Sequence, residues 1–276
     1  MTIEDRGGIA SRLRVGLGSL IAVEAQASTP ALAEVAIAAA FEAIATVDRT
    51  MHPHRAGSDL AALANCEPGQ RLGLHPWTWE VLQLCERLHA SSAGVFDPCL
   101  DAAPGRLQDV EFIPPNCVRP HERVCVDLGG IAKGYAVDRA LAALKAAGCT
   151  AGMVNAGGDL AVFGEQARLI LCRTSQGTVL FPLKDAALAT SDAQAPDRPA
   201  EHRGYYHGVR RSVLAHGYAS VIAPRAVLAD ALTKCVLMCE PAHSQAVLER
   251  FGAREVHFAA ASPALRTPAP SPDRGA

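Results

Sequence analysis

Two glycine turns beside one predicted helix constrain the fold of this chain most strongly. Residues 126–138, VDLGGIAKGYAVD, predict a strand, a glycine turn and a helix, and residues 154–160, VNAGGDL, predict a strand that ends in a second glycine turn. Glycine lets the main chain approach a ligand closely and adopt positive φ, so both turns can present backbone N–H groups to phosphate. Lys133, in the first helical turn, adds a positive charge there. A nucleotide or dinucleotide is therefore the first candidate ligand, and two ordinary turns with a surface lysine are the alternative.

The same two segments resemble the central motifs of the ApbE family, the flavin transferases that move FMN from FAD onto proteins. Three further motifs agree with that family in content and in order, namely GVFDP at residues 94–98, ATS at residues 189–191 and ADAL at residues 229–232. The resemblance runs from about residue 13 to residue 260. It therefore predicts one ApbE-like domain at 13–260, with tails at 1–12 and 261–276, the second of them proline-rich and expected to be disordered.

The overall composition is typical of a soluble enzyme. The chain has 276 residues, 49% of them hydrophobic, which is enough for a substantial core. Its formal net charge of −2 gives no general attraction to nucleic acid or to an anionic membrane, and an aromatic content of 5% argues against a stacking platform for single strands. No nucleic-acid partner is expected.

The N-terminal segment and the cysteines favour a cytoplasmic protein. Residues 1–12 carry charged side chains and no apolar run, so no signal peptide is visible, and nine scattered cysteines are expected to be free thiols. The long apolar stretch at residues 31–47 contains Glu34 and Glu42, and Thr29 with Pro30 form a helix start. We therefore expect a buried helix there and no membrane insertion.

The pattern of apolar and turn residues predicts a mixture of helices and antiparallel strands. Helices are expected at residues 31–51, 58–64, 76–94, 131–147, 227–238 and 241–251, strands at residues 12–25, 124–128, 152–155, 218–222 and 255–258, and an antiparallel meander over residues 160–190. This arrangement indicates an α+β sandwich. The resemblance implies a tunnelling-fold-like architecture of antiparallel sheets and packed helices, with FAD in a cleft between them.

The resemblance also implies roles for individual residues. The residues expected to cradle FAD come from both glycine turns and from the ATS strand end, namely Gly129, Gly130, Lys133, Gly157, Gly158 and Ser191. Asp97 and Asp138 are candidate polar contacts of the cleft, and each could equally cap a turn or a helix. The motif segments that would meet the isoalloxazine ring depart further from the family pattern than the dinucleotide part does.

In the family, Mg²⁺ offsets the charge of the diphosphate. The resemblance assigns its ligands to the Gly130 carbonyl and to Asp230. Both supply oxygen atoms, which hard cations prefer. The family's next ligand is a threonine four residues after the aspartate, but that position holds Lys234, with Thr233 one residue early. The Lys234 ammonium could replace the metal, sit beside it, or point to solvent.

A histidine ahead of the last strands is the family's general base, and His207 occupies that place. Its imidazole suits proton transfer near neutral pH. The Asp-Pro that normally follows is replaced by Arg210 and Arg211, and His216 and His202 are weaker candidates.

Together these features predict a cytoplasmic, metal-assisted FAD:protein FMN transferase. It would join FMN to a Ser or Thr hydroxyl of an acceptor flavoprotein and release AMP. A non-catalytic FAD-binding protein and an FAD pyrophosphatase are the alternatives.

Overall fold

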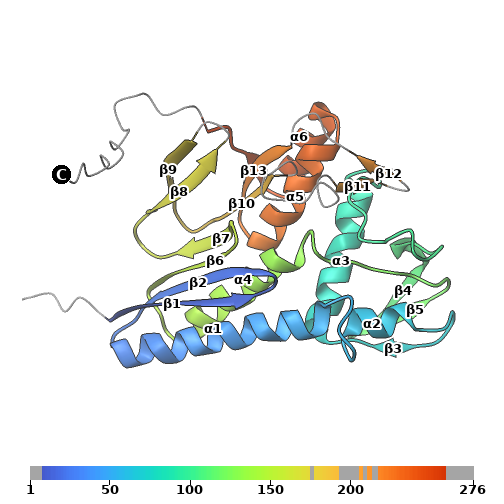
Figure 1. Ribbon diagram of the computed structural model, residues 1–276, viewed down its shortest axis with the longest axis horizontal. Coiled ribbons are helices and arrows are strands. Elements are labelled where there is room, and N and C mark those ends of the chain that lie inside the picture. The colour runs from blue at the N-terminus through green and yellow to red at the C-terminus, as the bar shows by residue number, and fades with distance from the viewer. Residues whose placement is uncertain (1–7, 175–176, 193–204, 208–209, 213–216, 259–276) are drawn as a thin grey trace, which may run out of the picture.

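A seven-stranded antiparallel sheet forms the centre of the protein (Figure 1). The computed structural model describes residues 8–174, 177–192, 205–207, 210–212 and 217–258. The strand order is β1-β2-β6-β7-β10-β13-β14. The strands are β1 (Ile9–Gly16), β2 (Ser19–Gln26), β6 (Ala151–Ala156), β7 (Asp159–Phe163), β10 (Ala187–Asp192), β13 (Tyr218–Ala223) and β14 (Arg254–Glu255).

Three helices cover one face of this sheet. They are α1 (Pro30–Met51), α4 (Ala132–Ala146) and α5 (Ala226–Met238). Helix α1 packs on β1, β2 and α4, while α4 packs on β6 and β7, and α5 on α4, β10 and β13. Alternate strand residues such as Val23, Val154 and Val221 point into the core that these helices share. This layer places the start of α4 beside α5.

The opposite face of the sheet is covered in part by the hairpin of β8 (Arg168–Thr174) and β9 (Gly177–Leu183). A second apolar cluster joins Ile170 and Leu183 of this hairpin to Leu160, Leu188 and Ile222 of the sheet. The two layers on the two faces confirm the α+β class with antiparallel sheets and packed helices.

The remaining elements pack around the central sheet and its three helices. Helices α2 (Asp59–Ala64) and α3 (Pro76–Ser91) follow α1, and β3 (Leu72–Gly73), β4 (Val110–Ile113) and β5 (Cys117–Pro120) form a small sheet. Helix α6 (Pro241–Arg250) packs on α5, and β11 (Tyr205–His207) pairs with β12 (Arg210–Ser212). A short 3₁₀ helix spans Leu107–Asp109.

Several predicted elements differ in detail. The strand expected at residues 12–25 is a hairpin, because Leu17 and Gly18 both adopt positive φ and reverse the chain. Strand β1 starts at Ile9, inside the expected N-terminal tail. Residues 160–190 are not a simple meander, since β7 pairs with β10 while β8 and β9 pair only with each other. Strands β4 and β5 lie at residues 110–113 and 117–120, where none of the expected helices and strands falls.

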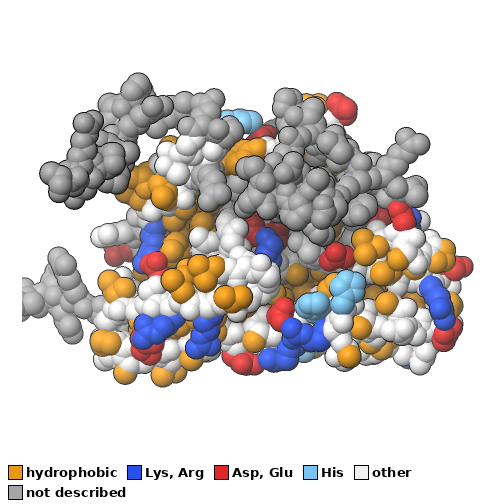
Figure 2. All heavy atoms as spheres, in the orientation of Figure 1, with side chains coloured by type: hydrophobic (Ala, Val, Ile, Leu, Met, Phe, Trp, Pro, Cys, Tyr) orange, Lys and Arg blue, Asp and Glu red, His pale blue; other side chains and the backbone are white. Residues whose placement is uncertain are grey.

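The long apolar helix α1 is the one helix of the described chain that is long and apolar enough to span a membrane by length and composition. In this fold its apolar stripe, including Ile37, Ile44 and Val47, is buried in the core. Its two glutamates lie outside that stripe, where Glu34 pairs with Arg12 and Glu42 with Arg49. Figure 2 shows acidic and basic side chains interspersed on the visible face, with apolar side chains over β1 and β2. Leu13, Val15 and Leu20 of these two strands are exposed.

Candidate functional site

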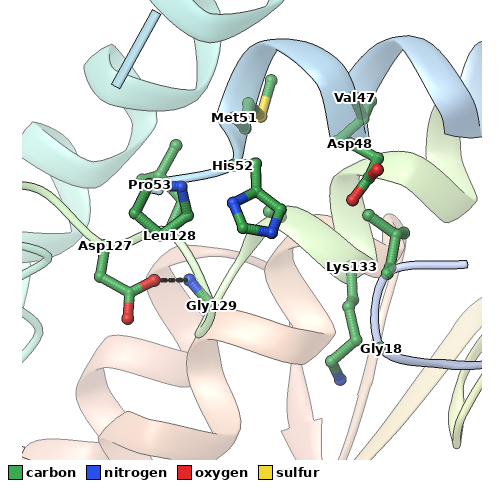
Figure 3. A pocket seen from close by; sticks show the side chains of 12 residues that line it. Gly18, Val47, Asp48, Met51, His52, Pro53, Asp127, Leu128, Gly129 and Lys133 are labelled. Atoms are coloured by element: carbon green, nitrogen blue, oxygen red, sulfur yellow. Dashed lines mark hydrogen bonds between the residues drawn. The ribbon is translucent and has the colours of Figure 1, made fainter. Parts of the chain in front are cut away.

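The predicted motifs converge on one cleft of about 330 Å³, called here the main cleft. It is lined by Val95, Phe96, Asp97, Pro98, Leu100, Asp127, Gly129, Gly130, Ile131, Lys133, Gly157, Thr190, Ser191, Lys234 and Met238. A neighbouring hollow of about 320 Å³ shares Asp127, Gly129 and Lys133 with it (Figure 3). Segments separated by more than a hundred residues therefore meet where α4 begins.

The first glycine turn leads directly into helix α4. Gly129 donates its N–H to Asp127 Oδ1 at 2.8 Å (Figure 3). Ala132 donates its N–H to the Leu128 carbonyl at 2.8 Å. Contrary to the expectation of positive φ at this turn, neither Gly129 nor Gly130 adopts it. Their lack of a side chain keeps the backbone open towards the cleft, which they both line.

The second glycine turn is a two-residue hairpin between β6 and β7. Gly157 and Gly158 have φ of 65° and 105°, which only glycine adopts readily. Asn155 Oδ1 accepts the Gly158 N–H at 2.9 Å and fixes the turn. Gly157 lines the main cleft, and a Cβ there would overlap Ser19 Oγ, whereas Gly158 shapes the turn without lining the cleft.

Lys133 extends from the first turn of α4 and forms an ion pair with Asp159, the first residue of β7. Asp159 is 2% exposed, whereas the Lys133 side chain lines both the main cleft and the neighbouring hollow. Burial raises the pKa of Asp159 to about 6, and the nearby Asp230 carboxylate adds to this, while Lys133 and Lys234 oppose it. The predicted phosphate-binding lysine thus has a buried anionic partner within the protein.

Asp230, on α5, is fully buried and has hydrogen-bond partners on α4 and on its own helix. Its Oδ2 accepts the Gly134 N–H of α4 at 3.0 Å, and its Oδ1 pairs with the Lys234 ammonium. Lys234 Nζ also donates to the Asp230 carbonyl at 2.9 Å. Burial alone would raise the pKa of Asp230, but Lys234, then Lys133, and the Gly134 N–H hold this pKa below its ordinary value.

Thr233 and Ser191 form the next layer around this pair. Thr233 Oγ1 donates to the Asp230 carbonyl at 2.7 Å and lies 2.7 Å from Ser191 Oγ. A hydroxyl carries one proton, so Ser191 is the donor in the second contact. Ser191 therefore bridges the cleft lining at the end of β10 to the buried network on α5.

As arranged, these residues do not fit Mg²⁺. The oxygens of Asp230 face an ammonium and a backbone N–H, and Thr233 is engaged by Asp230 and Ser191. A Cβ built on Gly130 would lie 3.5 Å from Lys234 Cε, so the lysine stem runs beside the glycine whose carbonyl was the third expected ligand. Among the described residues there is no group of three or more His, Cys, Asp or Glu side chains that could hold a metal ion.

Of the two remaining candidate carboxylates, Asp97 lies in the main cleft and Asp138 lies outside it. Asp97 lines the main cleft, and its Oδ1 accepts the Cys99 N–H at 2.9 Å in a local turn. Asp138 does not line the cleft, because its two oxygens accept the Ala226 and Val227 N–H groups at 2.7 and 3.1 Å. The structure thus favours the cap interpretation for Asp138, which caps α5 from helix α4.

The predicted base falls at the edge of the described chain. His207 ends β11 opposite Arg210 of β12 by backbone register, and its side chain lies outside what the structure describes. His202 and His216 also lie outside the described residues. The assignment of a general base stays a prediction.

Three important residues were missed as site residues although they stand inside the quoted motifs. They are Gly134, Asn155 and Asp159. Gly134 and Asp159 act through partners on other elements, so the motif letters alone gave no signal for their contacts. Asn155 precedes a Gly-Gly turn, a place where an Asn side chain often bonds to nearby backbone, and this signal was available.

Comparison with known proteins supports the family resemblance that the sequence motifs indicate. The ApbE family model matches residues 17–109 and 102–258. No curated protein sequence matches the chain. Among solved structures, the Pseudomonas stutzeri flavinyl transferase ApbE has a TM-score of 0.77 at 20% identity, with 94% of each chain covered.

Two more solved structures share the fold. The flavin transferase ApbE from Vibrio cholerae has a TM-score of 0.70 at 18% identity, covering 90% of this chain and 92% of its own. The Thermotoga maritima ApbE protein has a TM-score of 0.67 at 20% identity, covering 88% of this chain and 91% of its own. At these identities the likeness shows the fold, while the family model spans most of the sequence, and the chain belongs to the ApbE family.

Proposed function

We propose that this protein transfers FMN from FAD to a Ser or Thr hydroxyl of an acceptor flavoprotein. In this step the hydroxyl oxygen attacks the FMN phosphorus, the bond from that phosphorus to the bridging oxygen breaks, and AMP leaves with that oxygen. The hydroxyl proton passes to a base. Family membership supports the reaction class.

The observation that carries the proposal is the convergence of two lysines on one cleft. Lys133 and Lys234 come from helices α4 and α5, and both line the main cleft beside Gly130 and Gly157. A dinucleotide places two negative phosphates between its two ends, and ammonium groups held in a partly buried site attract them strongly. The main cleft and the neighbouring hollow adjoin at Lys133, so a ligand with two ends can occupy both.

Fixed geometry around the lysines supports catalysis as well as binding. Lys133 is held by the buried Asp159, and Lys234 by Asp230, so little reorganisation is needed when charge develops on the leaving phosphate. The Gly157 turn is fixed by Asn155 and brings main chain to the same cleft. His207 is the proposed base for the acceptor hydroxyl.

One observation favours a second candidate, a non-catalytic FAD-binding protein. Asp230 is already paired with Lys234, which would leave the site able to bind a diphosphate but less able to activate it than with a divalent ion. Such a protein would bind FAD and release no AMP.

The test is incubation of the protein with FAD and a flavoprotein acceptor. Covalent flavin fluorescence on the denatured acceptor together with stoichiometric AMP establishes transfer, and an acceptor whose target Ser or Thr is replaced by Ala is the control. AMP without covalent flavin identifies an FAD pyrophosphatase. FAD binding without AMP identifies the non-catalytic protein, and either result defeats the proposal.

A further inference from the structure

A lysine occupies the floor of the main cleft where the family pattern leads one to expect a divalent cation. Lys234 is 6% exposed, and its ammonium contacts both Oδ1 and the backbone carbonyl of Asp230. We propose that this ammonium takes the place of the metal, so that the cleft binds the diphosphate of FAD without Mg²⁺. The identity of the ligand rests on the function proposed above.

The first support is that the side-chain oxygens of Asp230 and Thr233, the expected metal ligands, are already bound within the protein. Asp230 Oδ2 accepts from Gly134 at 3.0 Å, and Thr233 Oγ1 is shared between Asp230 and Ser191 at 2.7 Å each. A magnesium ion requires near-ideal octahedral oxygen geometry. To bind one here, the protein would have to break the Asp230–Lys234 pair inside a buried site, which is costly because it leaves buried charge uncompensated.

The second support is the charge balance at the floor of the cleft. Two cations, Lys133 and Lys234, stand against two buried carboxylates, Asp159 and Asp230, so the four charges sum to zero. With a neutral residue at position 234 the same group would carry one net negative charge, which would repel a diphosphate unless an external cation joined it. The lysine therefore supplies within the chain one of the two positive charges that a Mg²⁺ ion would bring.

The third support is the position of the lysine stem. It passes Gly130, where a built Cβ would lie 3.5 Å from Lys234 Cε and 3.9 Å from Cδ. The ammonium thus lies between the first glycine turn and Asp230, in the cleft that Gly157 and Ser191 also line. It is a compact point charge, which can stabilise phosphate but cannot coordinate two phosphates from opposite sides as a divalent ion does.

Two binding measurements on the whole protein test the proposal. The first is titration with FAD in EDTA and in millimolar Mg²⁺. We expect the parent dissociation constants in the two conditions to agree within about threefold, and Lys234→Thr to weaken binding in EDTA by about tenfold, as expected for the loss of a charge-assisted contact. Mg²⁺ should restore much of that loss in Lys234→Thr. Lys184→Thr, which removes an exposed lysine, is the control for net charge.

The second measurement is Mn²⁺ binding followed by electron paramagnetic resonance, which needs neither FAD nor activity. We expect no stoichiometric site in the parent and a new site in Lys234→Thr. Stoichiometric Mn²⁺ binding by the parent that Asp230→Asn abolishes, or parent FAD binding that requires Mg²⁺, overturns the proposal. If Lys234→Thr does not fold, these two parent measurements still decide it.

These measurements distinguish failure of the proposed transfer activity from failure of the proposed role of Lys234. Tight, metal-independent FAD binding without transfer to any acceptor defeats the proposed function and supports the role of Lys234. Transfer that depends fully on Mg²⁺ supports the function and overturns the role of Lys234. If FAD does not bind at all, the proposed function and the proposed binding of its diphosphate are both wrong, and the Mn²⁺ comparison then shows only whether Lys234 excludes the metal.

Discussion

Asp230 of helix α5 accepts the backbone N–H of Gly134, in the first turn of helix α4, at 3.0 Å. Position 134 has no room for a side chain, because a Cβ there would overlap the Ala226 carbonyl and lie 2.8 Å from Asp230 Cβ. This close crossing holds the start of α4 against α5, and therefore holds Lys133 and Lys234 at one cleft.

The first prediction concerns this crossing. Gly134→Ala should destabilise the fold by about 1–3 kcal/mol, because overpacking against backbone must separate the helices, although alanine is the better helix former. Chemical denaturation measures the change. Gly73→Ala is the matched control, since nothing lies within 4 Å of a Cβ built there. Equal stability of Gly134→Ala and the parent would show that the two helices can move apart freely.

The second prediction separates the cap role of Asp138 from a role in FAD binding. Asp138→Ala should cost about 1–2 kcal/mol of stability, because two N–H groups at the start of α5 lose their acceptor. FAD affinity should change less than about twofold, since Asp138 does not line the main cleft. Asp138→Asn, which keeps one acceptor oxygen, should lose less stability. A large loss of FAD affinity in a stable Asp138 variant would show that this residue takes part in FAD binding.

Local sequence signals predicted much of the fold but little of the long-range pairing. Thr29 with Pro30 and Ser58 marked the starts of α1 and α2, and both caps are observed. The turn at Leu17 was missed because a leucine with positive φ is rare. The i,i+4 spacing of Asp230 and Lys234 made their pairing foreseeable.

The contacts that build the site were harder to foresee, because they join residues distant in the sequence. Lys133 meets Asp159 only because α4 packs on β6 and β7, and Asp138 meets α5 across 88 residues. Motif spacing placed Lys133 and Ser191 among the cleft-lining residues. It could not reveal which side chain binds which, since that is set by tertiary packing.

The third prediction concerns pH. The pKa of Asp159 is about 6 in the folded protein, against an ordinary value of 3.8, so between these values the folded state holds the proton more tightly. The contribution of this group to stability is therefore full below about pH 4 and is lost as pH rises through about 6, with a slope of at most about 1.4 kcal/mol per pH unit. Asp159→Asn should remove this component.

Denaturation of the parent and of Asp159→Asn across pH 4–7 checks this expectation. The difference in unfolding free energy between the two proteins should change over that range in favour of the variant. Asp109→Asn, at the 3₁₀ helix away from the cleft, is the control. A pH-independent difference would mean that Asp159 titrates normally in the folded protein.

The fourth prediction assigns Lys133 to phosphate binding. Lys133→Met keeps the apolar stem but removes the charge, and should weaken FAD binding about tenfold. Because Asp159 would lose its partner, its carboxylate should also take up a proton more readily. Fluorescence titration with FAD measures the affinity, and Lys145→Met, an exposed lysine at the other end of α4, is the control. Unchanged FAD affinity in Lys133→Met would show that this lysine has a structural role and does not bind phosphate.

The last prediction tests the general base. His207→Ala should leave FAD affinity unchanged and reduce transfer by about a hundredfold, because general-base assistance typically supplies that much. His257→Ala, at a side chain that is 84% exposed, is the control. Equal transfer rates in His207→Ala and the parent would show that His207 is not the base, and His216 and His202 would be tested next.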